Sequence, residues 1–301
     1  MNPTFRRFRV SLVVLSLLSI VIGKKVSAAT NDSVQLRVVT YNLRYASSSG
    51  PNSWPQRRPL VREVVESLSP DIMGTQEGVL DQLKDIAADL PDYAWIGTGR
   101  DGGNKGEFMA VFYRTNRFEP LATNHFWLSD TPEVEASTTW GNSIRRMVTW
   151  IRFRERASGI EFAFFNTHFD HAVELARQKS ATLLRWRIQQ LPAELPVIVT
   201  GDFNSSPNSA AYRTLTDEGF LTDAWKSSPI RKNESIGTFN SFQGIRTNGP
   251  RIDWILTRGN VKTLESAIDI TKPNGQWASD HFPVLSVLEV SSTQSAKASG
   301  N

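Results

Sequence analysis

The sequence predicts an α/β fold in which helices pack outside a mixed β-sheet. Strand-like apolar runs alternate with amphipathic helix patterns in the N-terminal part of the chain and again after residue 170. In the middle, strand patterns follow one another without a helix between them, which indicates paired strands. About 270 residues remain after the N-terminal segment, and this length suits one large domain better than two small ones.

The N-terminal part of this domain is predicted to alternate strands with helices. Residues 59–68 carry apolar side chains at helical spacing, with Pro59 near the start, and are therefore predicted to form a helix. The other elements predicted here are strands at 36–41, 71–76 and 107–114 and a helix at 80–90.

Strands dominate the patterns of the C-terminal part. The continuous apolar run at 196–200 is typical of a strand buried on both faces. The remaining elements predicted are strands at 147–153, 160–167, 252–257 and 282–290 and a helix at 174–190. His125 lies in the stretch TNHFWLSD, which is predicted to be a loop without a functional motif.

The first 28 residues are predicted to be a signal peptide. Three arginines precede an apolar run at 10–22, which is too short to span a bilayer comfortably. Val26-Ser27-Ala28 then offers a small-residue cleavage site. We therefore expect a secreted or periplasmic protein without a stable membrane anchor after cleavage. Lys24 and Lys25 leave an uncleaved anchor open as the alternative.

Composition excludes several classes of site and partner. The chain has no cysteine, so it contains no disulfide and no zinc–thiolate site, which fits an oxidising compartment. The whole chain has 34 basic and 30 acidic residues, but five of the basic residues lie in the predicted signal peptide, which leaves 29 against 30 and a net charge of −1. Because non-specific binding to long nucleic acid requires many Lys and Arg contacts, nucleic acid is not favoured as a partner.

Polar side chains follow or begin most of the predicted strands. Carboxylate and amide oxygens are the ligands that Mg²⁺, Mn²⁺ and Ca²⁺ prefer, whereas zinc prefers nitrogen and sulfur. Each residue alone has a structural explanation; an Asp-His pair, for example, is common in surface turns. As an ordered set they indicate a site: Asn42, Glu77, His168, Asp202, Asn204, Asp253, Asp280 and His281.

The two histidines in this set have candidate acidic partners. We expect Asp253 to orient His281 and Glu107 to orient His168, because a carboxylate fixes the tautomer of an imidazole. Together with a metal, such histidines favour hydrolysis at phosphorus, and Arg146 could add a phosphate contact.

Asp170 and His171 add a second acid–histidine pair directly after His168. They could contact a metal or a substrate hydroxyl. The alternative is that Asp170 caps the helix that follows.

The order YN, QE, GE, R, TH, GDFN, RIDWI and SDH resembles the endonuclease/exonuclease/phosphatase superfamily. The resemblance extends from about residue 36 to 290, and GDFN and SDHFPV are its most specific parts. It implies a four-layer α/β sandwich like that of pancreatic-type deoxyribonuclease, with two central mixed β-sheets flanked by helices. The domain would span residues 33–291, followed by a disordered tail at 292–301. FWLSDTPEVE and WGNS resemble a secreted bacterial branch.

The resemblance also implies roles for the matching residues. Mg²⁺, or alternatively Mn²⁺ or Ca²⁺, would be bound by Glu77, Asn42 and Asp280. The catalytic residues would be His281, His168, Asp202, Asn204, Asp253 and Glu107. The substrate would also contact Arg146, Asn204 and Asp170. A tyrosine that some nucleases of the superfamily place near the Glu107 position has no counterpart here.

The function expected from the sequence is a secreted, metal-dependent hydrolase of phosphate esters that acts as a monomer. Its substrate would be a small or lipid-linked phosphodiester or phosphomonoester. A DNA or RNA nuclease of the same fold is the first alternative. A non-catalytic binding module on this scaffold is the alternative from another class.

Overall fold

The computed structural model describes residues 33–292 together with Met1. The predicted signal peptide, apart from Met1, and the predicted tail, apart from Ser292, lie outside the described residues. Among the described residues, no helix has both the length and the apolar character needed to cross a membrane. The first strand begins at Ser33 and the last ends at Ser291.

The first sheet has seven strands in the order β12-β14-β15-β1-β2-β6-β4. β1 lies at its centre, parallel to β2 and antiparallel to β15. The bounds are β1 (Ser33–Asn42), β2 (Ile72–Gln76), β4 (Tyr93–Ile96), β6 (Val111–Arg114), β12 (Arg231–Lys232), β14 (Val261–Ile268) and β15 (Val284–Ser291).

The second sheet has six strands in the order β11-β13-β10-β9-β8-β7. β9 and β10 are parallel and place His168 opposite Asp202, while antiparallel β13 places Asp253 on the other side of Asp202. The bounds are β7 (Phe118–Trp127), β8 (Met147–Glu155), β9 (Glu161–His168), β10 (Val197–Asp202), β11 (Thr222–Asp223) and β13 (Asp253–Arg258). β3 (Gly78–Val79) and β5 (Glu107–Phe108) form a separate pair.

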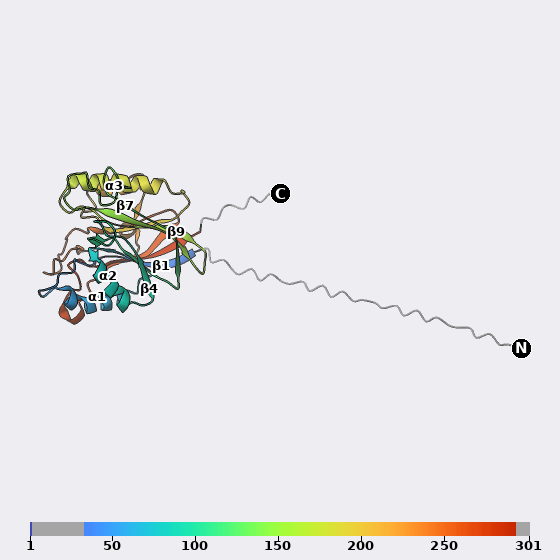
Figure 1. The fold of residues 1–301 in the computed structure, drawn as a ribbon, viewed down its shortest axis with the longest axis horizontal. Helices are drawn as coiled ribbons and strands as arrows, with labels where there is room; N and C mark the ends of the chain where they lie inside the picture. Colours follow the sequence, from blue (N-terminus) through green and yellow to red (C-terminus); the bar gives the residue numbers. More distant parts are fainter. Residues whose placement is uncertain (2–32, 293–301) are drawn as a thin grey trace. The chain divides into compact units, whose positions relative to one another are not determined.

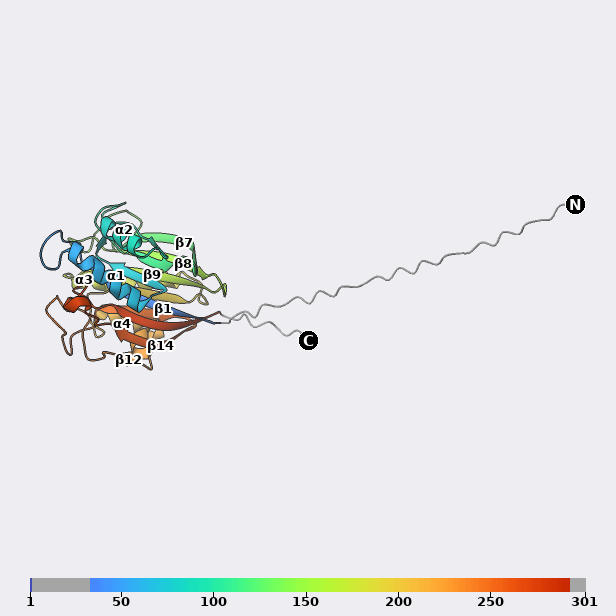
Figure 2. The same ribbon diagram turned by 90° about the horizontal axis from the view of Figure 1, so that it is seen from below.

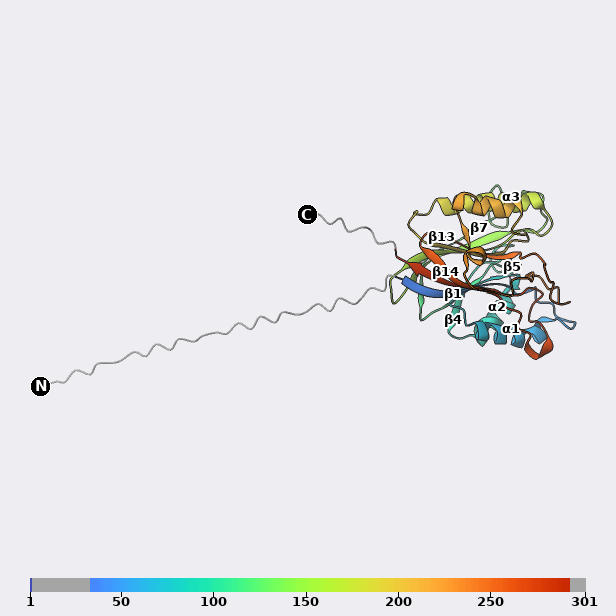
Figure 3. The same cartoon turned by 180° about the vertical axis from the view of Figure 1, so that it is seen from behind.

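Helices flank both sheets (Figures 1 and 3). α1 (Trp54–Leu68) and α2 (Leu80–Asp89) pack on the first sheet, and α3 (Glu174–Gln189) and α4 (Ala210–Thr216) pack on the second. The turned view in Figure 2 shows α1 along the first sheet beside the red β15–β14 ribbon. The short elements are α5 (Ala224–Ser227), η1 (Asp217–Gly219) and η2 (Pro273–Gly275).

Three layers of apolar side chains hold these elements together. One lies between the two sheets and includes Leu36 and Val38 of β1. A second lies between the first sheet and its helices and includes Val39 and Tyr41. Because side chains alternate along a strand, β1 supplies both layers and is buried on both faces. The third layer joins α3 and α4 to the second sheet. The predicted α/β sandwich of two mixed sheets with flanking helices is therefore confirmed.

Several predicted boundaries differ from the structure. α1 begins at Trp54, five residues before the predicted start, so Pro59 lies inside the helix. The predicted strand at 107–114 is divided into β5 and β6 by Met109 and Ala110. His125 lies within β7 and not in a loop, because β7 pairs along its length with β8 despite its polar sequence.

Candidate active site

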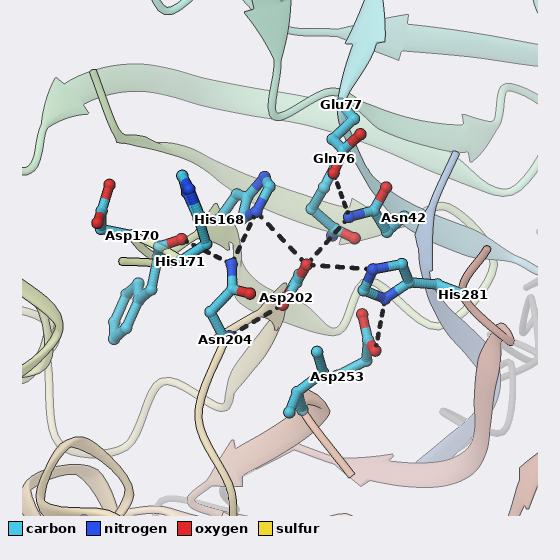
Figure 4. A network of polar contacts seen from close by, with 12 residues as sticks. Asn42, Gln76, Glu77, His168, Asp170, His171, Asp202, Asn204, Asp253 and His281 are labelled. Carbon is cyan, nitrogen blue, oxygen red and sulfur yellow. Dashed lines mark hydrogen bonds and ion pairs between the residues drawn. The ribbon is translucent and has the colours of Figure 1, made fainter. Parts of the chain in front are cut away.

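The ends of strands from both sheets meet around one cavity of about 480 Å³. β1 and β2 of the first sheet end there, as do β9 and β10 of the second, and β13 begins there. Figure 4 shows the side chains that converge on its floor. The residues that line the cavity are Arg44, Tyr45, Glu77, Arg100, Glu107, Ile144, Arg146, His168, His171, Asp202, Asn204, Phe239, Asp280 and His281.

Asp202, Asp253 and His281 form a buried group at the floor. His281 Nδ1 lies 3.0 Å from Asp253 Oδ2, and His281 Nε2 lies 3.7 Å from Asp202 Oδ2. The structure thus brings His281 together with the carboxylate predicted to orient it. The ligand atoms of the three residues lie within 4.8 Å of one another, a spacing that a metal could also bridge. Because the Nδ1 contact already occupies one ring nitrogen, the group is better suited to hold a proton.

The charges in this group perturb one another strongly. Burial alone would lower the pKa of His281, but the Asp253 and Asp202 carboxylates outweigh it and raise the pKa to about 10. Burial and the Asp253 charge raise the pKa of Asp202 to about 7. The imidazolium therefore holds Asp202 beside the cavity as a carboxylate that can accept a proton near neutral pH.

His168 ends β9 on the other side of Asp202. Its Nε2 lies 3.0 Å from Asn204 Nδ2 and 3.4 Å from Asp202 Oδ2, while its Nδ1 is buried without a hydrogen-bond partner. Burial and the charges of Arg146 and Arg100 hold the pKa of His168 well below its usual value. The predicted pairing with Glu107 is wrong, because the Glu107 carboxylate is bound by Arg100 at 2.5 and 2.9 Å.

One side of the cavity, here called the acidic wall, consists of Glu77, Asp280 and Asn42. Asn42 Nδ2 donates to Glu77 Oε1 and to Asp202 Oδ2, both at 3.0 Å, and its oxygen accepts the Arg44 N–H. Asn42, which the resemblance placed around the metal, thus turns its amide nitrogen toward the carboxylates and acts as a hydrogen-bond donor.

The two carboxylates of the acidic wall differ in pKa. Burial would raise the pKa of Glu77, but hydrogen bonds from Asn42 and Tyr45 and the His281 charge hold it below its usual value. Burial raises the pKa of Asp280. Arg44, half-exposed, lies 3.9 Å from Glu77 and 3.7 Å from Asp280. This set of anionic oxygens fits a hard divalent cation.

The opposite side, here called the cationic wall, consists of Arg100, Arg146, His168 and His171. Arg146 is buried; its Nε lies 3.4 Å from Asp170 Oδ2 and its Nη2 lies 3.1 Å from His171 Nδ1. Its Nη1 is buried and has no hydrogen-bond partner. Burial raises the pKa of Glu107 to about 7 despite the charge of Arg100.

Asp170 does not lie where a substrate contact requires it. Its Oδ1 accepts the N–H groups of Ala172 and Val173 at 2.9 and 2.8 Å, just before α3 begins at Glu174. Its other oxygen faces Arg146, and Asp170 is not among the cavity-lining residues. The prediction that Asp170 binds substrate is therefore corrected. Its carboxylate closes the turn before α3 and holds the Arg146 guanidinium.

Sequence reasoning missed five residues of the cavity: Arg44, Tyr45, Arg100, Ile144 and Phe239. Arg100 lies in the loop GTGRDGGNKGE between β4 and β5, where the glycines mark a turn but not its direction. The Trp127 indole donates to the Arg100 carbonyl at 2.7 Å, and this contact between distant segments fixes the arginine in the cavity. No local sequence signal could have indicated that Arg100 lines the cavity.

Comparison with known proteins finds relatives with the same fold. The family described as the endonuclease/exonuclease/phosphatase family matches residues 39–281. A crystal structure of a protein described as a member of this family from Bacteroides thetaiotaomicron is 36% identical, with a TM-score of 0.81, over 86% of this chain and 96% of that one. A mannosyl-6-phosphatase from the same organism is 37% identical, with a TM-score of 0.80, over 84% of this chain and 99% of that one.

Curated relatives are more distant. An uncharacterized protein of Acanthamoeba polyphaga mimivirus is 29% identical over 78% of this chain and 92% of its own length. Nocturnin from Drosophila melanogaster is 23% identical over 83% of this chain, and the match spans 44% of that protein.

Proposed function

This chain belongs to the endonuclease/exonuclease/phosphatase family, whose members hydrolyse phosphate esters, and we propose that it is a divalent-metal-dependent phosphomonoesterase acting on small, hydroxyl-rich phosphates such as sugar phosphates. The relative that supports this substrate class is the mannosyl-6-phosphatase, because the match spans nearly all of that chain. A cavity of about 480 Å³ is of a size that suits a small ligand.

The pair of guanidinium groups in the cationic wall is the observation that carries the proposal. Arg100 and Arg146 line the same cavity as Asp202, so both can contact a phosphoryl group bound there. A phosphomonoester carries two negative charges and a diester one. Because a buried guanidinium with a free N–H binds an extra anionic oxygen well, this wall favours the monoester.

The residues divide the chemistry between the two walls. Glu77 and Asp280 would hold the divalent ion, which when bound neutralises charge on the phosphoryl and leaving oxygens. Asp202, with a pKa raised to about 7, accepts a proton from the attacking water, and the neighbouring His281 keeps Asp202 in place. The Arg146 guanidinium, whose Nη1 has no protein partner, donates to phosphoryl oxygens and orients them. Asn204 Nδ2 contacts His168 Nε2 and donates to the Phe169 carbonyl, and thereby fixes His168 beside Asp202.

We also propose that the protein is exported. The supporting features are the basic start, the apolar run and the small-residue site at 26–28, together with the absence of cysteine. Mass spectrometry of the mature protein should find an N-terminus close to Ala29. An intact N-terminus in the membrane fraction would instead favour the uncleaved anchor.

A substrate panel tests the proposed activity. With Mg²⁺, a hexose 6-phosphate should give the highest kcat/KM, ahead of an aryl phosphodiester, RNA and plasmid DNA. Arg100→Gln should lower kcat/KM for the monoester by ~10-fold, the scale of one charged hydrogen bond, and for the diester by less. Arg145→Gln is the matched control, because Arg145 pairs with Asp101 outside the cavity. Faster cleavage of plasmid DNA than of any monoester would replace this proposal with the nuclease alternative.

A further inference from the structure

Arg57 of α1 is fully buried and uses all five of its N–H groups on backbone carbonyls. Nε donates to Asn52 at 2.8 Å, Nη1 to Leu43 and Ala278 at 2.7 and 2.9 Å, and Nη2 to Arg44 and Tyr45 at 3.0 and 3.1 Å. Burial lowers the pKa of Arg57, and the more distant charges of Asp280 and Glu77 oppose this effect only in part. A buried charge without a counter-ion is costly, and the five hydrogen bonds to carbonyl oxygens offset that cost.

Three of these carbonyls belong to consecutive residues that follow β1. Arg44 has a positive φ of 59°, a conformation that side chains other than glycine adopt at a cost. In this turn the Tyr45 N–H donates to Glu77 Oε2 at 3.0 Å. By binding the carbonyls of Leu43, Arg44 and Tyr45 together, Arg57 holds the turn that presents this donor to the acidic wall.

A fourth carbonyl bound by Arg57 belongs to the segment that carries Asp280, the second carboxylate of the acidic wall. Ala278, whose carbonyl Arg57 binds, lies two residues before Asp280. Ser279 Oγ donates to the Asn42 carbonyl at 2.7 Å and ties the same segment to the end of β1. One guanidinium nitrogen, Nη1, therefore joins the Leu43 and Ala278 segments, which support Glu77 and Asp280 respectively.

We infer that Arg57 is a positioning residue that sets the separation of Glu77 and Asp280 and thereby the affinity of the acidic wall for a divalent cation. The inference rests on the proposed function, since it takes these two carboxylates to hold the metal. Arg57 does not line the cavity and touches no reacting atom. A lysine could not replace it, because an ammonium group has three donors in place of five.

The test is direct binding of Mn²⁺ without substrate, followed by the electron paramagnetic resonance signal of the free ion. Arg57→Lys should raise the Kd for Mn²⁺ by ~10-fold or more, while kcat at saturating metal stays within a few-fold of the wild type. Arg58→Met is the matched control: Arg58 is the next residue of α1 but pairs with Asp85 and Asp89. It should change stability without changing the Kd.

The outcomes separate the inference from the proposed function. Failure of the wild type to bind Mn²⁺ would refute the metal site itself. Binding by a folded Arg57→Lys variant with wild-type affinity would refute the role of Arg57 alone. If Arg57→Lys does not fold, Arg57→Gln tests the same role, because it removes the charge and keeps two of the five N–H donors. It should weaken Mn²⁺ binding several-fold, and unchanged binding would overturn the inference.

Discussion

Glu77 on the acidic wall is held by two neutral donors, Asn42 Nδ2 and the Tyr45 N–H, whereas Arg100 and Arg146 on the cationic wall each face a carboxylate. Neutral donors fix a carboxylate without cancelling its charge, and half-exposed Arg44, 3.9 Å from Glu77 and 3.7 Å from Asp280, screens that charge only in part. The acidic wall therefore retains negative charge that binds a cation. On the cationic wall, Glu107 and Asp170 cancel part of the charge of the two arginines but fix the orientation of each guanidinium group. The two walls thus combine strong attraction for a metal with oriented recognition of an anion.

Asp202 contacts Asn42 of the acidic wall and His168 of the cationic wall, and His281 lies beside it. Removal of His281 should therefore have the largest effect. His281→Ala should lower kcat by ~10³-fold, within the range of a positioned acid–base group, because Asp202 loses the cation that holds it. The measurement is steady-state kinetics on a hexose 6-phosphate, with circular dichroism as the control for folding.

A double variant sharpens this result. His168 contacts the same oxygen of Asp202 as His281 does. The loss in His281→Ala/His168→Ala should therefore be smaller than the product of the two single losses. Strictly multiplicative losses would show that the two histidines act independently.

Glu77→Gln should have the next largest effect and should act on the acidic wall alone. Removing one anionic oxygen should lower kcat by ~10²-fold and weaken the dependence on Mg²⁺, since a hard cation needs anionic ligands. A Mg²⁺ titration of activity measures both effects. Near wild-type rates at limiting Mg²⁺ would exclude Glu77 as a ligand.

All three residues of the acidic wall could be predicted from the sequence, whereas Arg100 of the cationic wall could not. Asn42, Glu77 and Asp280 lie next to strands, and a strand end is visible in a short run of residues. Arg100 reaches the cavity through a loop whose path depends on Trp127, a contact between distant segments. The same difference explains why Glu107 was paired with the wrong partner: its carboxylate is taken by an arginine that no motif marks.

The pH dependence of stability, measured in a chelator, should show a smaller effect, and its direction follows from the pKa of His281. The folded-state pKa of His281 is about 10, above its usual 6.5, so the folded protein holds this proton more tightly than the unfolded chain. The resulting stabilisation is fully present below pH 6.5 and is lost as the pH rises toward 10. Thermal unfolding of the metal-free wild type should therefore shift to lower temperature over this range. The shift should be smaller in His281→Gln, and equal slopes would contradict the assigned charge of His281.

His125 provides the smallest expected effect, because it lies in β7 away from both walls. Burial lowers its pKa, and its Nδ1 lies 3.1 Å from Thr149 Oγ1. His125→Gln should leave kcat/KM within a few-fold of the wild type. A group whose folded pKa is lowered favours the folded state above its usual pKa of 6.5 and loses that contribution as the pH falls. Between pH 7 and pH 5, the unfolding temperature of the variant should therefore depend less on pH than that of the wild type. A large loss of activity in this folded variant would contradict the prediction and would mean that His125 in β7 affects the cavity through the second sheet.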